Sequence, residues 1–128
     1  MIESKMYDKL QKQLKPYAIK LTRIENLFGC VPDIYFTSNQ LKGWIELKNI
    51  RYIRKDNTIK VPFRPGQYPW IKNHLYFQKG IYLIVTINNK WFIKENNKIQ
   101  EIYNLQNIEL LDLHMLVHHM YAYLRMFI

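Results

Sequence analysis

Two acidic side chains and one lysine lie in a stretch of the sequence that otherwise has the composition of core strands. The residues are Asp33, Glu46 and Lys48, and the stretch, residues 29–49, reads GCVPDIYFTSNQLKGWIELKN. The runs VPDIYFT and GWIELKN have the length and apolar content of strands, and SNQLK between them favours a turn. The sequence therefore predicts an antiparallel pair of strands that carries three ionisable groups.

The register of this pair decides which side chains meet. A turn centred between Asn39 and Gln40 places Asp33 directly opposite Glu46, so both carboxylates point to one face with Cβ atoms about 4.5–5.5 Å apart. Lys48 shares that face, because side chains alternate along a strand. The residues on the other face are apolar and are expected to lie in the core: Ile34, Phe36, Ile45 and Leu47.

These three groups together could support the hydrolysis of a phosphodiester. Opposed carboxylates repel each other, and a divalent cation between them attracts both and makes the arrangement favourable. Mg²⁺ typically takes one or two carboxylates with waters and phosphate oxygens, and it makes a bound water more acidic. Lys48 would stabilise the negative charge of the transition state. The alternative is a solvated strand face on which Asp33 or Glu46 pairs with Lys48.

The composition favours a globular protein with a polyanionic partner. The chain has 128 residues, enough for one domain and one modest core, and 48% of them are hydrophobic. Its formal charge of +9 favours nucleic acid, although an anionic membrane surface would also fit that charge. No apolar run is long enough to span a bilayer, the N-terminal residues lack the apolar core of a signal peptide, and Cys30 is the only cysteine. We expect a location in the cytoplasm of a bacterial or phage-infected cell, since the Lys, Asn, Ile and Tyr content is typical of an AT-rich source such as a phage.

The rest of the sequence predicts the elements that must position these groups. Met6, Leu10 and Leu14 recur at helical spacing before Pro16. The expected elements, in chain order, are a helix over residues 3–14, a strand within 17–26, the two strands above, a basic loop over 50–65, a helix over 66–79, a hairpin over 81–95 and an apolar helix over about 107–127. This order predicts an α/β fold in which helices flank a mixed sheet.

The motif and the order of elements resemble the PD-(D/E)xK nuclease superfamily. Asp33 after a proline, a strand-length gap and Glu46-Leu47-Lys48 match its motif, and Gln67 matches a glutamine on the helix that follows. The flanking GCV and RPGQYPWIKNH are similar to small VRR-Nuc and phage Holliday-junction-resolvase-like endonucleases. Over residues 3–95, the resemblance implies a restriction-endonuclease-like core and a Mg²⁺ site, in which Mn²⁺ substitutes. The implied ligands are Asp33, Glu46 and the Leu47 backbone carbonyl, with Lys48 catalytic.

The superfamily often adds an acid from its first helix to this set. Glu3 is the positional match and is preferred here as a catalytic and metal-binding residue. Glu25 is the second candidate, because it ends the strand that runs into the one holding Asp33. Apart from the resemblance, Glu3 reads as an acid favoured by the helix dipole, and Glu25 as a loop carboxylate paired with Arg23.

Basic side chains dominate the segment that follows Lys48, against the single acid Asp56. This composition favours contacts to phosphates, which position a nucleic acid without reading its sequence, although a solvated loop would have the same composition. The expected DNA-binding residues are Arg51, Arg54, Lys55, Lys60, Arg64 and Gln67.

The sequence thus predicts a single nuclease domain over residues 1–128. Apolar residues cover more than one face of the expected helix over 107–127, which would form a homodimer interface or pack across its own sheet. The predicted function is a Mg²⁺-dependent endonuclease that acts on DNA, with branched DNA or Holliday junctions preferred. The alternatives are a non-catalytic basic protein that binds nucleic acid and a nuclease for other DNA or RNA substrates.

Overall fold

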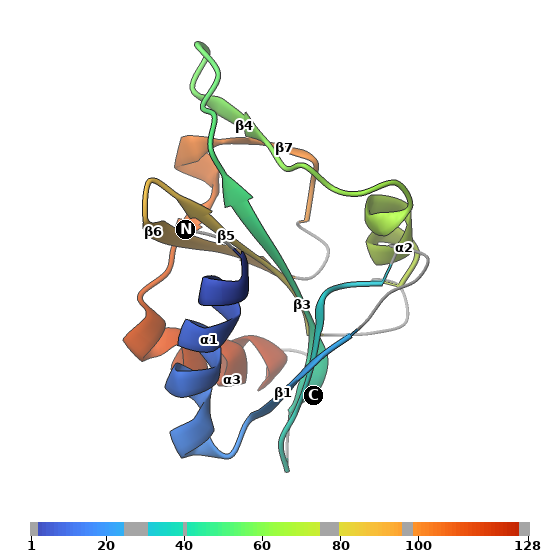
Figure 1. Cartoon of the computed structure of the whole chain (residues 1–128), viewed down its shortest axis with the longest axis vertical. Helices are drawn as coiled ribbons and strands as arrows, with labels where there is room; N and C mark the ends of the chain where they lie inside the picture. The colour runs from blue at the N-terminus through green and yellow to red at the C-terminus, as the bar shows by residue number, and fades with distance from the viewer. Residues whose placement is uncertain (1–2, 25–30, 40, 75–79, 96–98, 126–128) are drawn as a thin grey trace.

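The structure, a computed structural model of the whole chain, describes residues 3–24, 31–39, 41–74, 80–95 and 99–125. Its centre is a six-stranded mixed sheet in the order β1-β2-β3-β5-β6-β8, beside which β4 and β7 form a second sheet (Figure 1). The bounds in chain order are α1 Glu3–Leu14, β1 Lys20–Arg23, β2 Ile34–Thr37, β3 Lys42–Ile50, β4 Thr58–Lys60, α2 Gln67–His74, β5 Ile81–Ile87, β6 Lys90–Glu95, β7 Ile102–Asn104, β8 Glu109–Leu110 and α3 Leu116–Arg125. Short 3-10 helices lie at Lys15–Tyr17, Leu105–Asn107 and Leu113–Met115.

The long strand β3 lies inside the main sheet and is paired on both sides. It runs antiparallel to β2 and parallel to β5. A parallel pair requires a crossover connection, and here that connection contains β4 and α2. The expected mixed sheet flanked by helices is confirmed.

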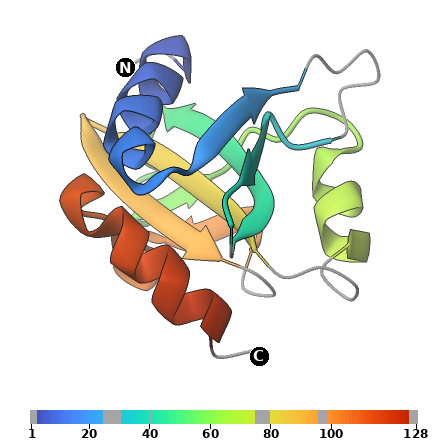
Figure 2. The same cartoon turned by 90° about the horizontal axis from the view of Figure 1, so that it is seen from below.

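A separate hydrophobic cluster covers each face of the main sheet. On one face, α1 and α3 both contribute to the first cluster, through residues such as Leu10 and Met120 (Figure 2). On the other face, Ile59 of β4, Ile71 of α2 and Tyr103 of β7 belong to the second cluster. The sheet is therefore the middle layer of three.

The first helix forms as its spacing predicts. Met6, Leu10 and Leu14 are fully buried on one stripe of α1. The helix ends before Pro16, the chain continues as a 3-10 turn, and Ala18 closes that turn in the left-handed region at φ 57°. This geometry leaves the N-terminal end of α1 beside the candidate site described below.

The expected loop over residues 50–65 is only partly a loop. Residues 58–60 form β4, in which Ile59 lies opposite Tyr103 of β7. The expected helix over 66–79 is α2, which covers 67–74, and residues 75–79 lie outside the described residues. The expected hairpin is confirmed, and Asn88 and Asn89 form its turn with φ values of 50° and 63°, as a type I′ turn requires.

The expected helix over about 107–127 is wrong in its first part. Ile108 and Leu111 are buried in the clusters on opposite faces of the sheet. Residues three apart lie on the same face of a helix, so these two require an extended chain, and Glu109–Leu110 accordingly form β8. Asp112 then accepts a hydrogen bond from the His114 N–H at 2.9 Å, and α3 starts four residues later. None of the described helices has the length and apolar character needed to cross a membrane.

Gly43 occupies a position in β3 that has no room for a side chain. A Cβ there would lie 2.0 Å from the Gly80 carbonyl oxygen and 2.7 Å from Cζ of Phe36. We expect Gly43→Ala to lower the free energy of unfolding by about 3 kcal/mol or more, because overpacking typically costs 1–3 kcal/mol and a backbone oxygen cannot rotate away. Urea denaturation measures this loss. Lys42→Ala, at an exposed neighbour, should cost less than about 0.5 kcal/mol, and an equally mild Gly43→Ala would contradict the prediction.

Candidate active site

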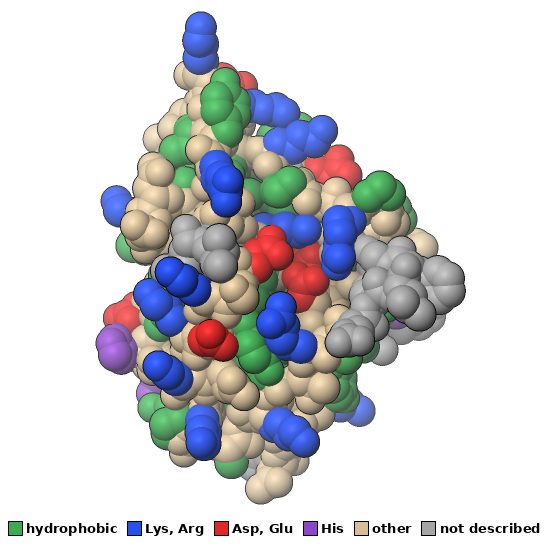
Figure 3. Space-filling model, in the orientation of Figure 1, with side chains coloured by type: hydrophobic (Ala, Val, Ile, Leu, Met, Phe, Trp, Pro, Cys, Tyr) green, Lys and Arg blue, Asp and Glu red, His purple; other side chains and the backbone are tan. Residues whose placement is uncertain are grey.

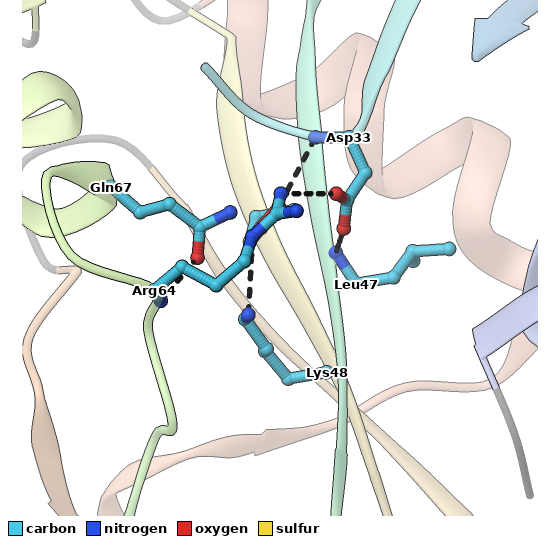
Figure 4. A network of polar contacts seen from close by, with 6 residues as sticks. Asp33, Leu47, Lys48, Arg64 and Gln67 are labelled. Carbon is cyan, nitrogen blue, oxygen red and sulfur yellow. Dashed lines mark hydrogen bonds and ion pairs between the residues drawn. The ribbon is translucent and has the colours of Figure 1, made fainter. Parts of the chain in front are cut away.

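The pairing of β2 with β3 brings Asp33 and Glu46 together. Ile34 lies opposite Ile45, which is the register expected from the sequence. The Asp33 N–H donates a hydrogen bond to Glu46 Oε1 at 3.1 Å, and the Leu47 N–H donates to Asp33 Oδ2 at 3.4 Å (Figure 4). Each carboxylate is therefore held by the backbone of the opposite strand.

Glu46 and Lys48 share one face of β3, as predicted, and both are buried. Their exposed fractions are 0% and 5%, and Lys48 Nζ lies 3.6 Å from Glu46 Oε2. The ring of Phe63 lies 6.0 Å from the same Nζ. Within the described part of the chain, Glu46 Oε2 receives no hydrogen bond. Burial of an ionised oxygen without a hydrogen bond costs free energy. The ion pair with Lys48 is therefore not enough to stabilise two ionised carboxylates at Asp33 and Glu46.

The surroundings of Glu46 strongly favour its protonated form. Burial is the largest cause, and the adjacent Asp33 side chain adds to it by hydrogen bonding and by its charge, so the pKa of Glu46 rises from 4.5 to about 9. The Lys48 charge and the Asp33 N–H act in the opposite direction but are weaker. In the absence of a further cation, Glu46 therefore keeps its proton near neutral pH.

Arg64 and Gln67 reach this cluster from the segment that begins α2. Arg64 Nη2 lies 3.1 Å from Asp33 Oδ1, and both side chains are partly exposed (Figure 4). Gln67 is fully buried; its Oε1 accepts from the Arg64 N–H at 2.8 Å. Among the described residues, nothing hydrogen-bonds to Gln67 Nε2. Gln67 thus holds the backbone that aims Arg64 at Asp33.

Glu3 joins the electrostatic field of the cluster from the start of α1. Partial burial raises the pKa of Glu3, Asp33 raises it further, and Lys48 and Arg64 oppose the rise. The other candidate acid, Glu25, lies outside the described residues. Across the ranges that the structure describes, no three His, Cys, Asp or Glu side chains converge closely enough to hold a metal ion by themselves. The fold therefore places Asp33 opposite Glu46, with Glu3 nearby as a third acid.

The donor set around Asp33 and Glu46 fits a small, hard divalent cation. Glu46 Oε2 is buried and lacks a hydrogen bond, and the pair of acids needs added positive charge. The N–H and C=O of one strand residue point to the same side, so the Leu47 carbonyl faces the side on which its N–H contacts Asp33. Two carboxylates and one carbonyl match the oxygen ligands of Mg²⁺, which keeps several waters.

Lysine and arginine side chains surround acidic groups on one face of the molecular surface (Figure 3). Figure 3 shows acidic groups in the middle of this face with basic groups on several sides. Of the expected DNA-binding residues, Arg51, Lys55 and Lys60 are exposed, and Arg54 is half-buried. Arg64 differs from these four because it contacts Asp33 directly.

Aromatic side chains pack beside the acids on the same sheet face. Tyr35 and Trp44 lie opposite each other, with ring centroids 5.0 Å apart, and Trp44 contacts Trp70 of α2 at 5.5 Å. Trp70 in turn stacks on His74 at 3.7 Å. Sequence reasoning missed Trp70 and Phe63 as neighbours of the site, although both lie close to Gln67 in the sequence.

A hollow of about 510 Å³ lies at the other end of α1 from Glu3. It is lined by Gln11, Lys12, Lys15, Ala18, Ile19, Lys20 and Leu21. None of the residues that contact Asp33 or Glu46 belongs to it. The cluster of Asp33, Glu46 and Lys48 is therefore the stronger candidate for chemistry.

The comparisons with known proteins identify a fold. No protein-family model and no curated protein matches the sequence. A solved structure does match: Hjc of Archaeoglobus fulgidus, a Holliday junction resolvase from an archaeal hyperthermophile, with a TM-score of 0.56 and 14% sequence identity. The match covers 86% of this chain and 98% of that one. The chain therefore has a resolvase-like, restriction-endonuclease-like fold, and the identity is too low to transfer more than the fold.

Proposed function

We propose that this protein is a metal-dependent endonuclease of the PD-(D/E)xK superfamily that cuts DNA, with branched DNA preferred. The observation that carries the proposal is the buried Glu46, which faces Asp33 and Lys48 and keeps one carboxylate oxygen without a hydrogen bond. A purely structural strand face would expose these groups to water. The fold shared with a Holliday junction resolvase supports the same class of reaction.

Asp33, Glu46 and the Leu47 carbonyl would hold the Mg²⁺, with Mn²⁺ able to substitute. When bound, the ion supplies positive charge that polarises the phosphodiester and acidifies a water. The backbone hydrogen bonds across β2 and β3 keep both carboxylates oriented in the free protein. Little reorganisation is then needed when the substrate arrives.

Lys48 would stabilise the negative charge that develops on the attacked phosphate. Its ammonium group is buried against Glu46 and close to Phe63, so water screens it weakly. Arg64, which is half exposed, would exchange its contact with Asp33 for one with the DNA backbone. Gln67 would keep the Arg64 backbone in place and offer its free Nε2 as a donor.

Glu3 would be the additional acid, acting on the metal or on a bound water. Its electrostatic coupling to Asp33 and Lys48 supports this role. We expect Glu3→Gln to weaken Mn²⁺ binding, measured by calorimetric titration, by about tenfold, as removal of an outer-shell group typically does. Glu25→Gln is the comparison, and a larger loss in that variant would transfer the role to Glu25.

A homodimer would supply two active sites for the two strands of a junction. One metal centre addresses one phosphodiester, whereas resolution of a four-way junction requires two opposed cuts, and a twofold dimer provides them. Part of the C-terminal segment packs on its own sheet, because Leu116, Val117 and Met120 are buried. Among the described residues of this segment, Leu110 and Met115 stay 70% and 54% exposed and are available for an interface.

The proposal is tested by cleavage of matched DNAs with and without metal. We expect Mg²⁺-dependent cuts in a four-way junction, placed symmetrically, at a higher rate than in linear duplex of the same sequence, and no cuts in the presence of EDTA. Light scattering of the same sample should give the mass of a dimer. DNA binding without cleavage in any metal would favour the non-catalytic alternative. Equal nicking of linear and branched DNA by a monomer would support a nuclease but contradict the preference for junctions.

A further inference from the structure

The segment between β3 and β4, residues 51–57, projects from the molecule as an ordered arm, which we call the β3–β4 arm (Figure 1). The Arg54 N–H donates to the Thr58 carbonyl at 2.9 Å, and the Asn57 N–H donates to the Arg54 carbonyl at 2.9 Å. Asp56 Oδ1 accepts from both the N–H and the hydroxyl of Thr58. The Leu105 N–H donates to the Asn57 carbonyl at 3.1 Å, which attaches the arm to the 3-10 helix that follows β7.

The β3–β4 arm exposes an aromatic ring among basic side chains. Tyr52 is 69% exposed, the highest value for an aromatic residue in the described part of the chain. Arg51 and Lys55 beside it are exposed as well, whereas Ile53 packs against the second hydrophobic cluster. Burial of a Tyr ring would stabilise the fold. The arm is therefore anchored through Ile53 and its turn, while Tyr52 contributes little to folding.

An exposed ring flanked by cations matches the chemistry of an exposed nucleobase in a nucleic acid. Aromatic side chains stack on base faces, and neighbouring cations bind the phosphates. Inside an intact linear duplex, adjacent bases cover those faces. They are accessible in single strands, at strand ends, and at a branch point where its arms unstack. Tyr52 can therefore distinguish such DNA from linear duplex.

The position of the arm in the chain limits the distance to the candidate active site. Tyr52 follows Lys48 by four residues, and an extended chain advances about 3.3 Å per residue, so their Cα atoms lie within about 14 Å of each other. One DNA strand advances about 3.4 Å per nucleotide. That distance corresponds to about four nucleotides.

We propose that Tyr52 on the β3–β4 arm stacks on an exposed base at a branch point or in a single strand, within about four nucleotides of the bond that is cut. The last part of this statement rests on the proposed nuclease function. Arg51, Arg54 and Lys55 bind the backbone of the same DNA without regard to its form. Within this short segment, Tyr52 therefore recognises the branched or single-stranded form of the DNA, and the basic residues supply affinity for any DNA.

The test measures dissociation constants in Ca²⁺, without cleavage, for a four-way junction, a linear duplex and a single strand of matched length. Tyr52→Ala should weaken binding to the junction and the single strand roughly tenfold, since stacking is worth about 1–3 kcal/mol per base, and leave the duplex unchanged. Tyr52→Phe should bind like the wild type. Tyr17→Ala is the matched control, because Tyr17 is 45% exposed and also lies close in sequence to basic residues, Lys15 and Lys20. The triple Gln variant at Arg51, Arg54 and Lys55 should weaken all three complexes and flatten their salt dependence.

Stacking is located with 2-aminopurine placed singly along the junction strands. Tyr52 should quench this fluorescence within about four positions of the cleavage site, and Tyr52→Ala should restore it. No selective loss of affinity in Tyr52→Ala, or an equal loss on all three DNAs, would overturn the proposal. Because binding is measured without cleavage, a selective loss in a protein that never cuts DNA would retain the stacking role and refute only the nuclease.

Discussion

Asp33→Ala and Glu46→Ala are expected to abolish Mg²⁺-dependent DNA cleavage, and Lys48→Ala to slow it by about 10²–10³-fold. The acids would provide the carboxylate ligands of the metal, so either loss removes the ion that activates the water. Lys48 would act only in the transition state, and its loss should leave Ca²⁺-supported DNA binding largely intact. Single-turnover cleavage of a labelled junction separates these effects, because it reports chemistry without product release.

Asp8→Ala is the matched control for Asp33→Ala, since Asp8 is an exposed acid on α1 and its replacement removes the same kind of side chain. It should cleave like the wild type. Thermal melts show whether each variant is folded. Wild-type cleavage rates in a folded Asp33→Ala protein would refute the assignment of the site.

Glu46→Gln is expected to make the metal-free protein more stable at alkaline pH while it abolishes activity. The pKa of Glu46 in the folded protein is about 9, well above its ordinary value of 4.5. The folded state therefore binds a proton that the unfolded state has released, and stability falls as pH rises through this window. The slope attributable to one such proton is about 1.4 kcal/mol per pH unit. Glutamine carries no charge and removes that slope.

Urea denaturation of wild type and Glu46→Gln in EDTA, from pH 5 to pH 9, measures the difference. The free energy of unfolding of the wild type should fall more steeply with pH, and Mg²⁺ or Mn²⁺ should restore it in the wild type alone, since a ligand of the folded state stabilises that state. Asp33→Asn should narrow the pH window over which stability falls, by lowering its upper limit, because Asp33 contributes to the raised pKa of Glu46. Parallel curves for the wild type and the Gln variant would show that Glu46 is ionised without a metal.

The pairing of the two acids could be predicted because it depends on local features. A short turn fixes the register of a hairpin, and alternation then assigns Asp33, Glu46 and Lys48 to one face. The structure has this register. The first helix could also be predicted from the sequence, since Met6 and Leu10 recur at helical spacing before a proline.

The short strands β4, β7 and β8 could not be predicted from local features. Residues 58–60 pair with 102–104, more than forty positions away, and three residues carry too little periodicity to identify a strand. Residues 107–115 have the apolar content of a helix, and only the two sheet faces that Ile108 and Leu111 contact make this segment extended. The contact of Arg64 with Asp33 was missed for the same reason, because it depends on how the chain crosses from β3 to β5.

The parallel pairing of β3 with β5 has a consequence for when the proposed activity could appear during synthesis. Glu46 and Lys48 lie on a strand whose partner on one side, residues 81–87, is made much later by the ribosome. Contacts between distant segments form slowly, because the loop between them must first be closed. A nascent chain that lacks β5 should therefore lack the arranged acids and lysine, and should show none of the proposed nuclease activity near the ribosome. In the finished protein, the amides of β3 should be among the slowest to exchange with deuterium, since they are released only when the whole sheet opens.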